Sequence, residues 1–330
     1  MTAPAPLISI VIVAFESGAT LSRCLEALRA QTFGDFEVLL VDNGSSDGAP
    51  QAAAKADPAI RLIEAGGNIG FAAGNNLAAQ QARGQWLALL NPDAYADPDW
   101  LEQWLAAIQR RPQIRSFACL QKAADRPGKI DGAGDVLTLP GIPYRGAYGH
   151  DLTPLPEGEV FSACGAAHLI WRDLFLQLGG FDERFFCYCE DVDLGYRLRL
   201  IGEATLFVPQ AAVSHVGSAV LGARSDFALY HGAKNRLWLL IKNTPWPLLP
   251  VVALLHLPVL VLMLVMHALR GEAAPVLRGL AASLAGMGPI LASRRSVQAT
   301  CTVSAWAILR AMAISPLTLA RRSAVIRPRA

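Results

Sequence analysis

Short apolar runs alternate with amphipathic stretches along the first ninety or so residues. Runs typical of buried strands occupy residues 7–15, 36–41, 60–64 and 86–90, and helical stretches occupy residues 20–31, 49–56 and 72–83. This alternation predicts an α/β fold with a mostly parallel sheet covered by helices. Ligands of such sheets bind outside the carboxyl ends of the strands. The loops after Phe15, Val41 and Leu90 should therefore share one crevice.

The pattern weakens in the middle of the chain. Residues 121–160 are rich in glycine and proline and lack a clear period, so we expect an irregular segment with room for a hairpin. Regular structure should return at Val160–Ile170. Helices are then expected near residues 171–178 and 190–201, followed by a short strand at Thr205–Val208.

A long uncharged segment begins after Lys242. Residues 244–269 contain no charged side chain, and a helix over Trp246–Leu269 would be about 36 Å long, enough to cross a bilayer. Four prolines and two histidines interrupt it, so we expect an embedded, kinked or re-entrant segment; the alternative is a helix or hairpin packed on the protein. Further apolar helices are expected at 275–291 and 297–313.

Composition and charge sharpen this division. Apolar residues make up 53% of the 330 residues and charged residues 17%, which is more apolar than an ordinary soluble enzyme. The net charge is +2, but residues 270–330 hold nine arginines and one acid, Glu272, and so carry +8. A basic segment that follows an apolar run favours membrane lipid headgroups over nucleic acid as its partner. We therefore expect a catalytic region at 1–243 and a membrane-associated helical region at 244–330.

Three patterns argue against other classes of protein. The six cysteines lack CxxC spacing, which favours free thiols in a reducing compartment over a zinc site. No basic residues precede Leu7–Phe15, so this run predicts a strand and not a signal peptide. The glycine- and asparagine-rich run Gly66–Asn76 opens a helix, but it is not GxGxxG and no acid is placed for a nicotinamide ribose. A dinucleotide-dependent dehydrogenase is therefore not expected.

Two polar clusters follow predicted strands. Val41–Gly48 begins with Asp42, whose carboxylate can accept the N3–H of a uracil or thymine ring or can cap the next helix. Asn91-Pro92-Asp93-Ala94 follows the strand at Trp86–Leu90. Asp93 can supply an oxygen ligand to a divalent cation that bridges a diphosphate, or can simply belong to a proline turn.

A third cluster places three carboxylates at a helix start. Glu190, Asp191 and Asp193 lie within four residues and repel one another, although the helix dipole offsets part of that cost. One of them can act as a general base, with Arg197 as a pairing partner; the alternative is an N-terminal capping cluster. His215 follows a predicted strand and is either a structural histidine or a metal ligand.

Taken in order, these blocks resemble the inverting GT-A enzymes of glycosyltransferase family two, over about residues 7–243. The forms Asn91-Pro92-Asp93-Ala94, Phe181–Phe186 and Glu190–Leu194 look most like its bacterial rhamnosyltransferase branch. Members of that branch build O-antigen or related envelope glycans on polyprenyl-diphosphate lipids. Many carry a membrane-associating region after an element like Lys242-Asn243-Thr244-Pro245.

The resemblance implies a role for each matching residue. Asp191 would be the catalytic base, and Asp93 and His215 would bind Mg²⁺ or Mn²⁺. Asp42 would bind the pyrimidine. The other residues implied to bind the nucleotide sugar are Phe15, Glu16, Asn43, Asn68, Gly74, Asn75 and Asn91. Those implied to position the acceptor or the base are Glu190, Asp193, Arg197, Gly165 and Ala166. Asn91 departs from the family's DxD pattern, which bears on metal affinity.

The expected activity is hexosyl transfer with inversion, at the cytoplasmic face of the bacterial inner membrane. The resemblance implies L-rhamnose from dTDP-rhamnose as the donor sugar and a polyprenyl-diphosphate-linked or other glycan as the acceptor. A UDP- or GDP-sugar donor is the alternative within the family. A nucleotidyltransferase would need a lysine-rich phosphate loop, and Phe15-Glu16-Ser17 offers no lysine. A catalytically silent, membrane-bound glycan-binding protein is the remaining alternative.

Overall fold

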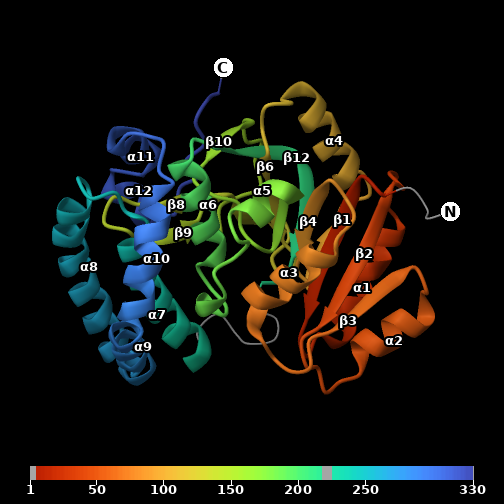
Figure 1. Cartoon of the computed structure of the whole chain (residues 1–330), viewed down its shortest axis with the longest axis horizontal. Coiled ribbons are helices and arrows are strands. Elements are labelled where there is room, and N and C mark those ends of the chain that lie inside the picture. Colours follow the sequence, from red (N-terminus) through yellow and green to blue (C-terminus); the bar gives the residue numbers. More distant parts are fainter. Residues whose placement is uncertain (1–4, 218–224, 330) are drawn as a thin grey trace.

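A twisted sheet dominates the computed structural model, which describes residues 5–217 and 225–329 (Figure 1). Its first part is parallel, in the order β3-β2-β1-β4. The strands are β1 (Ile8–Ala14), β2 (Phe36–Asp42), β3 (Ile60–Glu64) and β4 (Trp86–Leu90), connected by α1 (Gly18–Arg29), α2 (Ala49–Ala56) and α3 (Gly70–Gln81). Each of these elements confirms the alternation predicted from the sequence.

The apolar run of β1 is continuous because both of its faces are buried. Ile10 and Ile12 pack into one core cluster, whereas Val11 and Val13 pack into another on the opposite face of the sheet. Burial on both faces is the usual environment of a parallel strand. Gly74 of α3 faces Val13, and a Cβ at this position would lie 2.7 Å from Val13 Cγ1. The glycine therefore lets α3 lie directly against the sheet.

The second part of the sheet is mixed. The order continues from β4 through β11, β6 and β12 to β10, and β11 runs antiparallel between β4 and β6. The bounds are β5 (Ala94–Ala96), β6 (Ser116–Ala123), β7 (Ile130–Ala133), β10 (Gly158–Val160), β11 (Ala167–Trp171) and β12 (Thr205–His215). The prediction of a strand ending at Val208 was wrong. β12 continues to His215 through an irregularity between Val208 and Ala212, where Pro209 has no N–H for the ladder.

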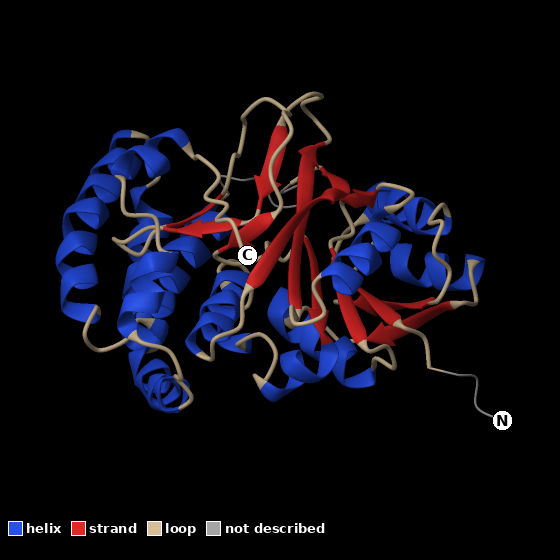
Figure 2. Cartoon of the chain, turned by 90° about the horizontal axis from the view of Figure 1, so that it is seen from above, coloured by secondary structure: helices blue, strands red, loops and turns tan. Residues whose placement is uncertain are grey.

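The region predicted to be irregular contains a hairpin. It consists of β8 (Asp135–Leu137) and β9 (Pro143–Arg145), and β7 pairs with β6 beside it. The remaining helices of this part are α4 (Trp100–Arg110), α5 (Arg172–Gln177) and α6 (Glu190–Leu200). Figure 2 shows the strands in the middle of the molecule with helices on either side of them.

Helices make up the rest of the chain and lie together beside the sheet (Figure 1). They are α7 (Asp226–Asn243), α8 (Leu249–Leu269), α9 (Ala273–Ala285), α10 (Met287–Ala299), α11 (Ala305–Ala311) and α12 (Pro316–Arg321). Helices predicted at 275–291 and 297–313 were wrong in their bounds. The chain bends by 61° between α9 and α10. Gly286 lies at this bend, where a Cβ would come within 2.4 Å of the Trp238 ring.

α8 is the apolar helix expected in the uncharged segment. Among the described residues it is the single helix long and apolar enough to cross a membrane, and the bent pair α9 and α10 passes the same test only when taken together. One side of α8 packs on the protein through Val252 and His256, and His256 Nδ1 lies 2.8 Å from the Pro140 carbonyl oxygen. The other side exposes leucines, including Leu254, Leu262 and Leu269.

Candidate active site

A hollow of about 870 Å³ opens at the carboxyl ends of β1, β2 and β4. Phe15, Asn43 and Asn91, one from each of the three loops, line it. The predicted shared crevice is therefore present. Its opposite wall is formed by the start of α6, including Asp191, and by Gly165 and Ala166 before β11.

Two backbone N–H groups hold the carboxylate of Asp191. The N–H of Gly165 donates to Oδ2 at 2.9 Å and that of Val192 donates to Oδ1 at 2.8 Å. Burial raises the pKa of Asp191, and these hydrogen bonds oppose the rise. A carboxylate that is fixed in place, faces a hollow and has a raised pKa suits the role of a general base.

Two further carboxyl groups lie close to Asp191. Burial, together with the negative charge of Asp191, raises the pKa values of both Glu190 and Asp135 well above the usual range. Asp135 begins β8 and accepts a hydrogen bond from Ser162 Oγ at 3.3 Å. Sequence analysis missed Asp135, because only the folding of the hairpin brings it to α6.

The loop that precedes Asp191 has an unusual backbone. Phe186, Tyr188 and Cys189 have φ values of 65°, 72° and 69°, a region that side chains rarely adopt. Asn235 of α7 stabilises this loop, since its Nδ2 donates to the carbonyl oxygens of Phe185, Cys187 and Tyr188 at 2.8, 2.8 and 2.7 Å. α7 therefore fixes the entry to the helix that carries Asp191. Sequence analysis did not single out Asn235.

On the other side of the hollow, His215 lies between two aspartates. Its Nε2 is 3.3 Å from Asp93 Oδ1, and its Nδ1 is 2.8 Å from Asp131 Oδ2. Burial alone would lower the pKa of His215, but the contacts with Asp131 and Asp93 raise it to about 9. Arg145 of β9 pairs with Asp131 in turn. Asp131 and Arg145 were not predicted, because they too lie in the irregular segment.

The pair formed by Asp93 and His215 fits a divalent cation. The carboxylate oxygen and the imidazole Nε2 lie 3.3 Å apart, close enough for one cation to bind both once Nε2 has lost its proton. Asp131 orients the ring from behind, as carboxylates do for metal-binding histidines. Asn91 Oδ1 is also buried and has no hydrogen-bond partner within residues 5–217 and 225–329. In that part of the chain no three His, Cys, Asp or Glu side chains form a complete metal site. A cation held by Asp93 and His215 would take its remaining ligands from a bound diphosphate or from water.

Several predicted nucleotide-binding residues shape the loops around the hollow. Asn43 Nδ2 donates to Asn68 Oδ1 at 3.1 Å, which joins the loop after β2 to the start of α3, and both residues line the hollow. Glu16 accepts hydrogen bonds from Ser46, whereas Asn75 Nδ2 donates to the Phe71 carbonyl within α3. Glu16, Gly74 and Asn75 do not line the hollow.

Asp42 also lies outside the lining of the hollow. Its Oδ1 accepts from the Ser45 N–H at 2.8 Å and its Oδ2 accepts from Gln51 Nε2 at 2.6 Å. Both oxygens thus stabilise the loop after β2. The pyrimidine-binding role of Asp42 stays a prediction. It requires the Asp42 carboxylate to contact the base beside the loop that this carboxylate stabilises.

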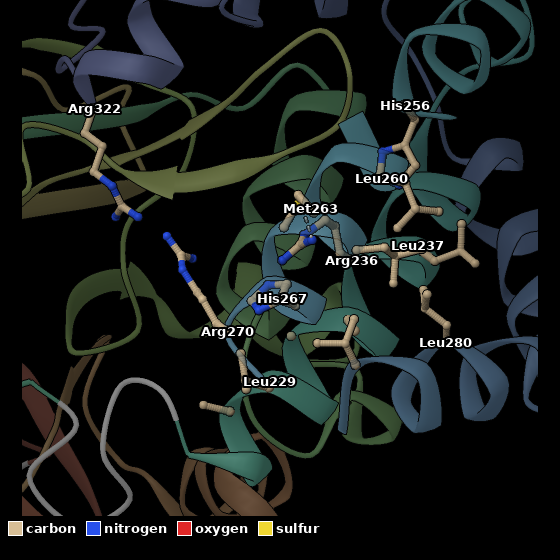
Figure 3. Close-up of a pocket in the computed structure, with 15 residues that line it drawn as sticks. Leu229, Arg236, Leu237, His256, Leu260, Met263, His267, Arg270, Leu280 and Arg322 are labelled. Carbon is tan, nitrogen blue, oxygen red and sulfur yellow. Dashed lines mark hydrogen bonds between the residues drawn. The ribbon is translucent and has the colours of Figure 1, made fainter. Parts of the chain in front are cut away.

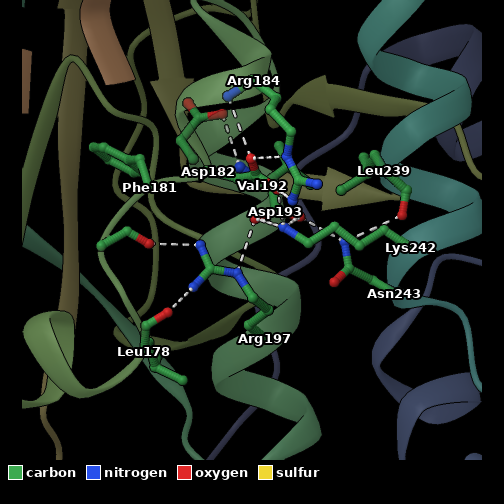
Figure 4. Close-up of polar contacts among 12 residues, drawn as sticks. Leu178, Phe181, Asp182, Arg184, Val192, Asp193, Arg197, Leu239, Lys242 and Asn243 are labelled. Atoms are coloured by element: carbon green, nitrogen blue, oxygen red, sulfur yellow. Dashed lines mark hydrogen bonds and ion pairs between the residues drawn. The ribbon is translucent and has the colours of Figure 1, made fainter. Parts of the chain in front are cut away.

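Asp193 and Arg197 do not line the hollow, and Figure 4 shows them among polar contacts with Lys242 and Asn243. Arg197 Nε donates to Asp193 at 2.8 Å, and its other nitrogens donate to the carbonyl oxygens of Leu178 and Gly180. Lys242 Nζ lies 2.9 Å from the Asp193 carboxylate, and Asn243 Nδ2 donates to it at 2.8 Å. Asp193 therefore joins α6 to α7, and Arg197 joins α6 to the turn at Leu178 and Gly180. Any effect of Asp193 or Arg197 on the acceptor or the base is indirect.

The sheet order and the acidic hollow at its carboxyl edge define a GT-A fold of the kind found in nucleotide-sugar transferases. Mannosyltransferase PcManGT from Pyrobaculum calidifontis, solved with GDP-Man and Mn²⁺, has a similar fold. It superposes with a TM-score of 0.55 at 17% identity, over 94% of this chain and 86% of that one.

Sequence comparison then gives the family. The model for glycosyl transferase family 2 matches residues 9–140. The N-acetylglucosaminyl-diphospho-decaprenol L-rhamnosyltransferase of Mycobacterium tuberculosis is 34% identical over 232 residues, which cover 63% of this chain and 76% of that protein. The O-antigen biosynthesis protein RfbC of Myxococcus xanthus is 33% identical over 258 residues, 72% of this chain but only 20% of its own length. The chain belongs to glycosyl transferase family 2 and is a glycosyltransferase of the rhamnosyltransferase-like branch.

Proposed function

We propose that this glycosyltransferase transfers L-rhamnose from dTDP-rhamnose, with inversion, to a sugar carried on a polyprenyl diphosphate. The observation that carries the reaction type is the Asp191 carboxylate, held by two N–H groups across one hollow from Asp93 and His215. The similarity to a rhamnosyltransferase named for a diphospho-decaprenol acceptor supports the choice of sugar and acceptor.

The residues suggest a single displacement. The hydroxyl oxygen of the acceptor attacks the anomeric carbon of the donor, and Asp191 takes the hydroxyl proton. The bond from the anomeric carbon to the diphosphate oxygen breaks, and the nucleoside diphosphate leaves with that electron pair. One displacement inverts the anomeric centre, so no enzymic nucleophile is needed. The raised pKa of Asp191 makes its carboxylate a stronger base than an exposed aspartate.

Asp93 and His215 would hold the divalent cation, Mg²⁺ or Mn²⁺, that the resemblance implies. When bound, the cation would neutralise charge on the departing diphosphate. The chain's own contribution is to place a carboxylate and an imidazole 3.3 Å apart and to orient the ring through Asp131. Asn91 lines the same hollow and would offer the donor its amide oxygen, which has no hydrogen-bond partner among the described residues.

The division at residue 243 and the membrane association of residues 244–330 are also part of the proposal. Val251, Leu254, Val261, Leu262 and Leu269 expose apolar surface along α8, with exposed fractions from 49% to 84%. Surface of this kind in water carries a free-energy cost that a lipid interior removes. α8 keeps one side on the protein, which favours a helix embedded alongside the catalytic region over one that leaves it. We infer a location at the cytoplasmic face of the inner membrane.

A donor panel tests this function. The full-length protein in detergent would be incubated with dTDP-rhamnose, UDP-GlcNAc, UDP-galactose or GDP-mannose, with a polyprenyl-diphosphate-linked GlcNAc acceptor and either Mn²⁺, Mg²⁺ or EDTA. We expect transfer from dTDP-rhamnose and loss of transfer in EDTA. Transfer from a UDP- or GDP-sugar alone would show that dTDP-rhamnose is not the donor. If no donor released its nucleotide, a catalytic role would be contradicted.

A further inference from the structure

A second hollow, of about 420 Å³, lies between α7, α8 and α9 (Figure 3). One face of α8 lines it, including Leu260, Met263 and Leu264. The hollow adjoins the active site, because Gly232, Arg236 and Arg322 line both. A single elongated ligand can therefore occupy the second hollow and still reach the first.

The second hollow combines apolar walls with three arginines. Arg236 comes from α7, Arg270 follows α8, and Arg322 follows α12. In the described part of the chain, none of the three forms an ion pair with a carboxylate, although most other arginines do. In Figure 3 the side chains of Arg270 and Arg322 extend toward one another. Like charges placed this way repel, and an anion between them would remove the repulsion.

Arg236 is the most constrained of the three. Its Nη1 contacts only a weak acceptor, Met263 Sδ, at 3.2 Å, and its Nε is buried with no hydrogen-bond partner in the described residues. Burial lowers the pKa of Arg236. A buried N–H group without a hydrogen-bond acceptor costs free energy, and an anionic ligand that accepts from it would recover that cost. Arg236 is also close enough to Cys189, two residues before Asp191, to act on its pKa.

We propose that the second hollow binds the diphosphate and the first isoprene units of a polyprenyl-diphosphate-linked acceptor. Arg236, Arg270 and Arg322 contact the diphosphate, Leu260 and Met263 contact the hydrocarbon, and the attached sugar enters the catalytic hollow toward Asp191. This assignment deepens the proposed function and rests on it.

The choice of this occupant follows from the shape and charge of the hollow. A free nucleotide would leave the leucines uncovered, and a plain hydrocarbon would leave the arginines unpaired. A membrane phospholipid has suitable chemistry but nothing to place in the adjoining active site. A pocket of a few hundred Å³ also matches the size of sites that bind small ligands, so only the head and the first units of a long chain fit.

Direct binding tests the proposal. Farnesyl diphosphate, a short polyprenyl diphosphate, would be titrated by calorimetry into the full-length protein in neutral detergent with saturating dTDP and Mn²⁺ to fill the donor site. The test variants are Arg270→Gln, which changes only the second hollow, and Arg236→Gln. The control is Arg295→Gln, which removes the same charge from the exposed face of α10 outside either hollow.

We expect Kd for farnesyl diphosphate to rise about tenfold to a hundredfold in each test variant and to stay within about twofold in the control. Farnesol and inorganic diphosphate should each bind at least about tenfold more weakly than farnesyl diphosphate, because each lacks one half of the contacts. Melting temperatures would check folding. If Arg236→Gln does not fold, the exposed Arg270 still decides the result.

Three outcomes would overturn the proposal. The first is an equal Kd for farnesyl diphosphate in wild type and Arg270→Gln, and the second is tight binding of inorganic diphosphate alone. The third is full displacement of farnesyl diphosphate by phosphatidylglycerol vesicles, which would indicate a general lipid site. Failure of the proposed function looks different. The wild type would then bind farnesyl diphosphate but transfer no sugar to a lipid-linked acceptor.

Discussion

At the scale of single residues, the sequence singled out the proposed base, Asp191, and both proposed metal ligands, Asp93 and His215, but not the groups around them. Asp191 and Asp93 follow recognisable elements, a helix start and a strand end, so local pattern was enough. Asp131, Asp135 and Arg145 lie in a segment without periodicity. Their positions depend on the pairing of β7 with β6 and of β8 with β9, which no local pattern encodes.

Replacing Asp191 with asparagine should remove transfer. The amide is nearly the same size, so the contacts with Gly165 and Val192 are largely kept, but it cannot accept the hydroxyl proton. We expect kcat to fall by about a hundredfold or more, while the Kd for dTDP with Mn²⁺ and the melting temperature change little. Transfer kinetics and nucleotide calorimetry would check this. Transfer near the wild-type rate would rule out Asp191 as the base.

The acid limb of the pH profile should report the same carboxylate. As the proposed base, Asp191 would work deprotonated, and its pKa is raised by burial, so activity should rise with pH across a range above the ordinary aspartate value of about 3.9. The measurement is kcat/KM for the acceptor between pH 4 and pH 8 in constant ionic strength. A rate that is flat down to pH 4 would contradict the raised pKa or the assignment.

Asp131→Asn should weaken cation binding, although Asp131 is not one of the two proposed metal ligands. Asp131 holds His215 Nδ1 at 2.8 Å and so would orient Nε2 toward the proposed cation. Loss of such a supporting carboxylate typically costs about tenfold to a hundredfold in metal affinity. Mn²⁺ titration in the presence of dTDP, followed by electron paramagnetic resonance, would measure it. His150→Ala, an exposed histidine outside the hollow, is the control and should bind Mn²⁺ as the wild type does.

At the scale of elements, the sequence predicted the strands and helices of the first half well, because each has a clear period and clear ends. It placed the C-terminal helices less well. The bend at Gly286 is set by the Trp238 ring on α7, a contact distant in sequence. In the same way, β12 continues past Pro209 because β5 and β6 offer partners on both sides of it.

The outward face of α8 should control membrane binding. Changing Leu254, Leu262 and Leu269 to glutamate places charges where lipid contact is proposed, and each charge in a bilayer interior costs about 2.5 kcal/mol or more on insertion scales. We expect the triple variant to lose flotation with anionic vesicles. The control Leu152→Glu/Leu176→Glu alters exposed leucines of the catalytic region and should float normally. Equal flotation of both variants would exclude α8 as the anchor.

At the scale of the whole molecule, α7 lies at the junction of the two proposed regions and holds a buried polar contact with the first of them. Lys242 Nζ lies 2.6 Å from Asp182 and 2.9 Å from Asp193, and both carboxylate side chains are buried (Figure 4). Burial alone would raise the pKa of Asp193, but Lys242 and Arg197 lower it. Arg294 of α10 donates in turn to the carbonyl oxygens of Ile241 and Thr244. Deleting residues 244–330 would therefore expose the end of α7. A loss of membrane binding in such a variant would reflect unfolding as much as the loss of a membrane contact.

Lys242→Met should destabilise the entire chain. It leaves Asp182 and Asp193 buried with fewer positive partners, and breaking a buried pair in this way costs about 3 kcal/mol. Urea unfolding at pH 7 would show a lower midpoint. The exposed pair Arg278–Asp226 is the comparison, because Arg278→Gln should cost less than about 1 kcal/mol. Both carboxylates have lowered pKa values, so their contribution to stability is complete above the ordinary aspartate pKa and is lost progressively as the pH falls below it. The difference in stability between wild type and Lys242→Met should therefore shrink in acid.

The backbone pairing of Arg327 with Glu159 has a consequence for how the protein is made. Their N–H and carbonyl groups exchange hydrogen bonds of 2.7 and 2.9 Å beside β10, and Arg322 reaches the active site from the same segment. During synthesis the sheet can assemble long before these residues leave the ribosome. Until they arrive, β10 offers an unpaired edge to other chains, and the acceptor side of the site is incomplete. During this interval we expect the β10 edge of the nascent chain to need protection, from chaperones or from the membrane itself.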